Sequence, residues 1–131
     1  MTNTQKRILV VDDDEMLREM HTSVFEDEDY LVDSAADGLE ALLLLSEQHY
    51  DLLATDLFMP ELNGIELIIK CQKEYPELKT LLLSGGGKDL EAEHGKKLVT
   101  YLGQEIEVGL FLKKPFDLEE MLNYVKNLLQ E

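Results

Sequence analysis

Cysteine, long hydrophobic runs and basic residues are all scarce in this chain of 131 residues. Because Cys71 is the only cysteine, no disulfide framework can form, and the sequence suits the reducing cytoplasm. The apolar runs, such as residues 8–11 and 81–83, are far too short to span a bilayer. The polar residues before Ile8 and the acid at Asp12 do not fit a signal peptide. We therefore expect no membrane partner.

Lysine and arginine number 12 against 28 aspartates and glutamates, which gives a formal net charge of −16. Nucleic acids and anionic lipids are polyanions, so this charge argues against direct binding to either. An apolar fraction of 44% can form a core, and the length suits a single domain over residues 1–131. Solubility explains most of the acids, but acids packed side by side at strand ends suggest a divalent cation.

Short apolar segments alternate five times with segments of helical periodicity. The predicted strands are 7–11, 31–35, 52–55, 80–84 and 110–113, and the predicted helices are 15–27, 37–48, 63–74, 89–102 and one that begins at Asp117. This alternation predicts an α/β fold with a doubly wound, five-stranded parallel sheet of order 2-1-3-4-5. With five helices it forms three α/β/α layers, the flavodoxin-like arrangement.

Helix boundaries and buried faces are also predicted. Asp14, Asp37, Asn63 and Asp117 stand where an N-cap is expected, three of them with an acid three residues later. Gly103 is expected to end the fourth helix. Apolar residues at helical spacing predict buried faces on the first two helices, and these include Met16, Met20, Leu39 and Leu43.

Three carboxylates should meet at one edge of this sheet. The first and third strands are neighbours in the predicted order, so Asp12 and Asp13 should lie beside Asp56. Two charges about 4 Å apart repel by about 4 kcal/mol at an effective dielectric constant of about 20, which calls for a counter-ion. Mg²⁺ fits best, because it takes few carboxylates and keeps its waters, whereas the spacing and central glycine of a calcium loop are absent.

Two further strand ends point to the same edge. Ser84 ends the fourth strand with a hydroxyl, and Lys114 follows the fifth with an ammonium group. A nucleophilic carboxylate, a metal, a hydroxyl and a cation together suit an incoming phosphoryl group. Individually, Asp56 could be only a helix cap, Ser84 a turn former and Lys114 a surface charge. Their convergence on one edge favours the phosphoryl site.

Several motifs together resemble the receiver domains of bacterial response regulators. They are Ile-Leu-Val-Val-Asp-Asp-Asp-Glu at 8–15, Asp37-Gly38 with Glu40-Ala41, Asp56 with Met59-Pro60 and Asn63-Gly64, Leu-Leu-Leu-Ser at 81–84 and Phe-Leu-Lys-Lys-Pro-Phe at 111–116. The similarity extends over about residues 6–129. No single motif is specific, but the combination is.

The resemblance implies a role for each residue of the predicted site. Asp56 would accept a phosphoryl group from a histidine kinase or a histidine phosphotransfer protein. Asp13 and Asp56 would bind Mg²⁺ directly with the backbone carbonyl of Phe58, and Asp12 would act mainly through water. Lys114 would contact the acyl phosphate and precede a cis peptide bond to Pro115.

The resemblance also implies a switch and an output surface. Ser84 would move toward the phosphate, and burial of Phe111 would accompany that movement. The fourth helix, fifth strand and fifth helix would then contact a downstream protein or a fused output domain. Such a protein is a phosphorylation-controlled binding module and not an enzyme.

One region departs from the receiver pattern. Residues 85–109 are longer than usual by roughly two helical turns, and Gly85, Gly86 and Gly87 follow Ser84. These glycines indicate either a mobile loop positioned by the phosphate or simply a long loop.

Two other functions stay open. An aspartyl-phosphate phosphatase is weakened because Met16 stands where the threonine of an Asp-x-Asp-x-Thr motif is needed after Asp12 and Asp14. A scaffold that binds without phosphate is the other alternative. The chain could be a stand-alone receiver or part of a longer regulator.

Overall fold

A central parallel sheet organises the computed structural model, which describes residues 5–86 and 89–130. Its strands are β1 (Arg7–Val11), β2 (Leu31–Ala35), β3 (Leu52–Asp56), β4 (Lys79–Ser84) and β8 (Phe111–Lys113). They lie in the order β2-β1-β3-β4-β8, and every neighbouring pair is parallel. Because β8 is the fifth parallel strand along the chain, this is the predicted order 2-1-3-4-5, and the fold class is confirmed.

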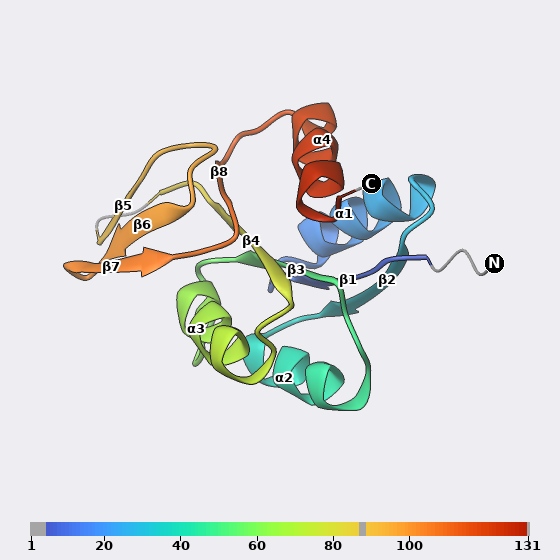
Figure 1. Ribbon diagram of the computed structural model, residues 1–131, viewed down its shortest axis with the longest axis horizontal. Helices are drawn as coiled ribbons and strands as arrows, with labels where there is room; N and C mark the ends of the chain where they lie inside the picture. The colour runs from blue at the N-terminus through green and yellow to red at the C-terminus, as the bar shows by residue number, and fades with distance from the viewer. Residues whose placement is uncertain (1–4, 87–88, 131) are drawn as a thin grey trace.

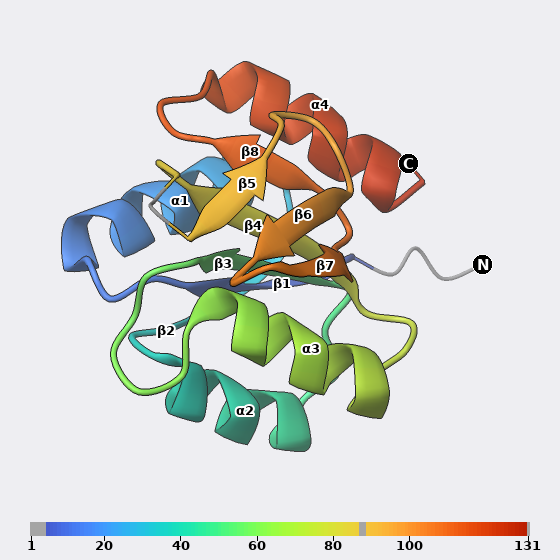
Figure 2. The ribbon, with the colours of Figure 1, turned by 90° about the vertical axis from the view of Figure 1, so that its left-hand side faces the viewer.

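Helices cover both faces of this sheet (Figures 1 and 2). They are α1 (Glu15–Asp27), α2 (Gly38–Glu47), α3 (Gly64–Glu74) and α4 (Leu118–Leu128). The helices α1 and α4 lie on one face and α2 and α3 on the other, so the predicted three layers are present. A separate hydrophobic core lies between the sheet and the helices on each face. One core includes Phe25 and Met121, and the other includes Ile65 and Ile68. Within the described ranges, no helix is both long and apolar enough to traverse a bilayer.

The predicted N-caps fix where the helices begin. The Asp14 carboxylate accepts hydrogen bonds from the Met16 and Leu17 N–H groups at 3.0 and 3.2 Å. At α3 the Asn63 side chain accepts from the Glu66 N–H, while the Glu66 carboxylate accepts from the Asn63 N–H, both at 2.9 Å. These bonds satisfy N–H groups that have no partner within the helix. Each helix therefore starts within a short turn or loop of a strand end.

The predicted buried faces of α1 and α2 are partly wrong. Met16, Met20, Leu39 and Leu43 are 79%, 39%, 55% and 58% exposed, respectively. Helix α2 instead buries Gly38, Ala41 and Leu45, which recur three and four residues apart and so share one face. At this spacing Leu39 and Leu43 are turned away from the sheet.

The predicted fourth helix over residues 89–102 is wrong. That segment belongs to a three-stranded antiparallel sheet of β5 (Leu90–Ala92), β6 (Leu98–Tyr101) and β7 (Gln104–Glu107), here called the β-meander. Leu102 and Gly103 form the β6–β7 turn with φ of 52° and 78°, so Gly103 belongs to a hairpin and ends no helix. The described residues therefore contain four α-helices and not five.

Side-chain packing explains why strands form in this region. Leu90, Val99 and Ile106 lie on the inner face of the β-meander and join the core on the α3 side of the main sheet. Val99 is only 1% exposed. The Gln72 side chain of α3 also donates to the Glu107 carbonyl of β7 at 2.6 Å. Side chains alternate between the two faces of a strand, so strands bury all of these residues on one face, whereas a helix would turn some of them toward solvent.

Candidate functional site

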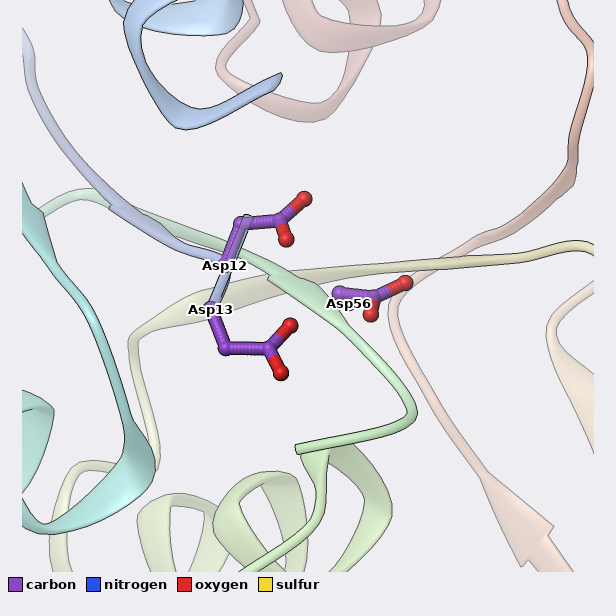
Figure 3. Close-up of side chains that lie close together, drawn as sticks. All are labelled: Asp12, Asp13 and Asp56. Atoms are coloured by element: carbon purple, nitrogen blue, oxygen red, sulfur yellow. The ribbon is translucent and has the colours of Figure 1, made fainter. Parts of the chain in front are cut away.

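The parallel register brings three acidic residues together. Strands β1 and β3 pair with Val11 opposite Thr55, so the residues that follow, Asp12 and Asp56, reach the same edge of the sheet. Figure 3 shows the carboxylates of Asp12, Asp13 and Asp56 near one another. One oxygen atom from each lies within 4.8 Å of the others. With Lys114 these residues are called the acidic rim below.

Asp12 is the buried member of the acidic rim, with 2% of its surface exposed. Its Oδ1 accepts from the Asp14 N–H at 2.9 Å, but its Oδ2 has no hydrogen-bond partner within the described part of the chain. Burial raises the pKa of Asp12, and the charges of Asp56 and Asp13 act in the same direction against the Asp14 hydrogen bond and Lys114. A buried carboxylate oxygen without a partner is unfavourable, and a cation would relieve it.

Lys114 balances part of the charge at the rim. Strand β8 pairs with β4, and the Lys114 N–H donates to the Ser84 carbonyl at 2.8 Å. The Lys114 Nζ atom then lies 2.8 Å from Asp56 Oδ1, in a pair whose side chains are 26% and 13% exposed. The peptide bond between Lys114 and Pro115 is cis, as the resemblance implies.

The predicted switch residues Ser84 and Phe111 are both buried. Ser84 is buried, and its hydroxyl donates to the Gly86 carbonyl at 3.2 Å and accepts from the Gly86 N–H at 3.1 Å. Phe111 is buried, whereas the Phe58 side chain is 54% exposed. Gly86 has φ of 102°, as a permissive turn requires, and Gly87 lies outside the described residues.

His21 borders the rim, although the sequence pattern assigned it no role. Its buried ring stacks on Phe116 with centroids 5.9 Å apart. Together with Leu17, Met20 and the segment that follows β8, it lines a hollow of about 400 Å³. Burial lowers the pKa of His21, and Lys114 lowers it further, against the opposite effect of Asp56. The helical spacing of Leu17 and His21 was the available signal that this histidine faces inward.

The β-meander contacts the loop that follows β3. The Asn63 side-chain amide donates to the Tyr101 hydroxyl at 3.1 Å, while Asn63 also caps α3. Asn63 ends the loop that directly follows Asp56, so this hydrogen bond connects β6 to the segment next to the Asp56 carboxylate. No residue pattern predicted this contact, because it depends on the unexpected strands.

The chemistry of the rim is that of a cation site beside an anion site. Clustered carboxylate oxygens suit a hard divalent cation. The Lys114 ammonium group suits an oxyanion attached to, or placed beside, Asp56. Asp56 touches both parts, so it is the carboxylate best placed to react.

A family model described as the response regulator receiver domain matches residues 8–126. The chain is 34% identical over 124 residues to the transcriptional regulatory protein CpxR homolog of Haemophilus influenzae, covering 95% of this chain and 50% of that protein. It is 30% identical over 126 residues to the sensor kinase CckA of Brucella abortus, covering 95% of this chain and 12% of that protein. The chain thus spans half or less of the length of these relatives.

Solved structures show the same fold. A CheY-like response regulator receiver domain protein from Methanospirillum hungatei aligns with a TM-score of 0.80 at 24% identity, covering 97% of this chain and 95% of that one. The response regulator protein TrrA of Thermotoga maritima, in complex with Mg²⁺-BeF, aligns with a TM-score of 0.76 at 30% identity, covering 95% and 99% of the two chains.

Proposed function

The chain belongs to the response regulator receiver domain family of two-component signalling, and from that premise we propose that Asp56 accepts a phosphoryl group. The donor in this proposal is a histidine kinase or a histidine phosphotransfer protein. The observation that carries the proposal is the acidic rim itself, where Asp56 lies among two other carboxylates and 2.8 Å from Lys114 Nζ. Its carboxylate is thus both oriented and partly charge-balanced before any donor arrives.

Mg²⁺ is the proposed cofactor. Asp13 and Asp56 are the direct ligands with the Phe58 carbonyl, and Asp12 acts through water. Asp12 Oδ2, which has no hydrogen-bond partner among the described residues, supports a cation at this place, as does the 30% identity to TrrA, whose structure holds Mg²⁺-BeF. When bound, Mg²⁺ balances negative charge on the carboxylates and on the transferred group.

The transfer step uses groups that the chain itself provides. An Asp56 carboxylate oxygen forms a bond to phosphorus while the bond from phosphorus to the donor's imidazole nitrogen breaks. The departing imidazole takes up a proton from solvent. Lys114 balances the charge of the transferred oxygens, and the Ser84 hydroxyl exchanges its Gly86 contact for one of them.

The phosphoryl group adds nearly two negative charges and biases a conformational switch through Ser84 and Phe111. The predicted output surface needs a correction, because its fourth helix is absent from the described residues. In the proposal the β-meander replaces that helix, so the output surface consists of the β-meander, β8 and α4. They contact a downstream protein or a fused output domain, consistent with the name of the CpxR homolog.

This proposal makes residues 1–131 a single cytoplasmic receiver domain that is not an enzyme, because the reaction ends with the phosphoryl group on Asp56. Intact-mass measurement with acetyl phosphate and Mg²⁺ tests it. We expect the wild type to gain one phosphoryl group, Asp56→Asn to gain none, and the exposed-site control Asp27→Asn to behave as the wild type. No gain by the wild type would favour a scaffold, and sustained release of phosphate from an ester would favour a phosphatase.

A further inference from the structure

We propose that His94, in the loop between β5 and β6, is a positioning residue for Lys114. The inference rests on the proposed function of Lys114 as the group that contacts the phosphoryl group. The central observation is a hydrogen bond of 2.9 Å in which the Lys113 backbone N–H donates to His94 Nδ1. Lys113 immediately precedes Lys114, so this bond fixes the backbone from which the lysine reaches Asp56.

The loop that carries His94 covers the outer edge of β8. Strand β8 is the last strand of the parallel sheet, so among residues 5–86 and 89–130 no strand pairs with its other side. The Gly95 N–H donates to the Phe111 carbonyl, and the Phe111 N–H donates to the Lys96 carbonyl, both at 2.8 Å. Residues 94–96 therefore run along this edge, and they bring the His94 ring to the end of β8.

The His94 ring uses both nitrogens. Nδ1 accepts from Lys113, so the neutral ring carries its proton on Nε2, which lies 3.0 Å from Glu120 Oε1 on α4. The ring also meets Tyr124 edge-on, with centroids 6.5 Å apart. Gly95 allows this approach, because a Cβ atom there would lie 2.9 Å from the Tyr124 hydroxyl. His94 thus connects the β-meander, β8 and α4.

Side chains do not fill the space on one side of the segment that carries Lys114. A hollow of about 310 Å³ is lined by His94, Glu120 and residues 113–117. On its other side Lys114 is held by the bond from its N–H to the Ser84 carbonyl. The bond from Lys113 to His94 therefore supplies support that side-chain packing on the hollow side does not.

The experiment compares two substitutions in the full chain. His94→Asn keeps an acceptor, because the asparagine Oδ1 can stand near the position of Nδ1, whereas His94→Leu keeps none. We expect His94→Leu to slow phosphorylation by acetyl phosphate, and to weaken binding of beryllofluoride, by about tenfold, the scale of one lost hydrogen bond. His94→Asn should restore both to within about twofold of the wild type.

Mg²⁺ affinity separates positioning from general damage. Lys114 repels a cation, so its displacement should leave Mg²⁺ binding unchanged or slightly stronger in His94→Leu. A loss of Mg²⁺ affinity equal to the loss of beryllofluoride affinity would overturn the proposal, as would equal phosphorylation rates in His94→Leu and His94→Asn. Hydrogen exchange of the Lys113 amide reports the link directly. Faster exchange in His94→Leu, but not in His94→Asn, would support the link between His94 and Lys113. This result does not depend on phosphorylation, so it stands even if the wild type gains no phosphoryl group and the proposed function fails.

Discussion

The acidic rim and the β-meander are neighbours that the sequence specifies in different ways. The rim is set by the register of the parallel strands, which places Asp12 and Asp56 together although they are far apart along the chain. The β-meander is set by a hairpin turn at Leu102 and Gly103 and by the burial of alternate residues such as Val99. The position of a site at the ends of parallel strands is thus easier to predict from the sequence than the secondary structure of a single segment.

Two glycines offer the strongest way to disturb separately the rim and the segment between β7 and β8, which joins the β-meander to the main sheet. A Cβ atom on Gly64 would lie 2.2 Å from the Asp56 carbonyl oxygen, and one on Gly109 would lie 2.1 Å from that of Thr80. We expect Gly64→Ala and Gly109→Ala each to lower the free energy of unfolding by about 3 kcal/mol, because backbone must move. Denaturant unfolding measures this.

The two substitutions should differ in function. Gly64→Ala should also abolish phosphorylation, because it displaces the backbone of Asp56, whereas Gly109→Ala should retain part of it. Gly85→Ala is the matched control, since no atom of the described residues lies within 4 Å of its added Cβ. Equal stability of all three variants would contradict the close approaches.

Mg²⁺ should stabilise the rim without acting on the β-meander. At 100 times its dissociation constant, we expect it to raise the free energy of unfolding by about 2.7 kcal/mol. Asp13→Asn should lose most of this gain, yet it should be more stable than the wild type without metal, because one repulsive charge is gone. Thermal melting with and without Mg²⁺ checks both statements. An Asp13→Asn variant that responds like the wild type would exclude Asp13 from the site.

Val99→Ala tests whether residues 89–102 form strands, as in the β-meander, or the helix predicted from the sequence. Val99 is 1% exposed in β6, so its truncation should lower the free energy of unfolding by about 2 kcal/mol. In an exposed helix, the same change would be stabilising by a few tenths of a kcal/mol. Thr100→Ala, at the adjacent and partly exposed position, is the control for strand propensity. A neutral or stabilising effect of Val99→Ala would favour the helix.

Asp12 gives the smallest expected effect and a defined pH dependence. Its pKa in the folded protein is raised above the ordinary 3.8, chiefly by burial. As the pH falls from 7 through this raised pKa toward 3.8, the folded protein binds a proton at Asp12 before the unfolded chain does. The Asp12 carboxylate therefore destabilises the folded state at neutral pH and ceases to do so in acid. Without metal, Asp12→Asn should be more stable by on the order of 1 kcal/mol at pH 7.

The difference between the Asp12→Asn variant and the wild type should shrink on acidification. Unfolding curves of both proteins, each without metal, at neutral and acid pH measure it. A difference that grew toward acid would show that the pKa of Asp12 is lowered instead.

The parts predicted from sequence are those governed by local or topological rules. Caps such as Asp14 and Asn63 were recognised because their bonds reach only two or three residues ahead. The sheet order and the meeting of Asp12, Asp13 and Asp56 followed from rules for parallel crossovers. Lys114 was placed because it directly follows the last strand of that sheet.

The missed parts depend on contacts that residue patterns do not encode. Residues 89–102 contain apolar residues at spacings that a helix or paired strands could both bury, and tertiary packing decided for strands. His94 has no motif, because its partners Lys113 and Glu120 come from other elements. The exposure of Met16 likewise depends on how α1 is rotated on the sheet.

The extra sheet also gives the protein an edge that must be kept from self-association. An unpaired strand edge such as that of β7 can template aggregation with other chains. Here the strand is only four residues long, Glu105 and Glu107 place like charges along it, and Gln72 occupies the Glu107 carbonyl at 2.6 Å. These features oppose the pairing of β7 with a strand of another chain.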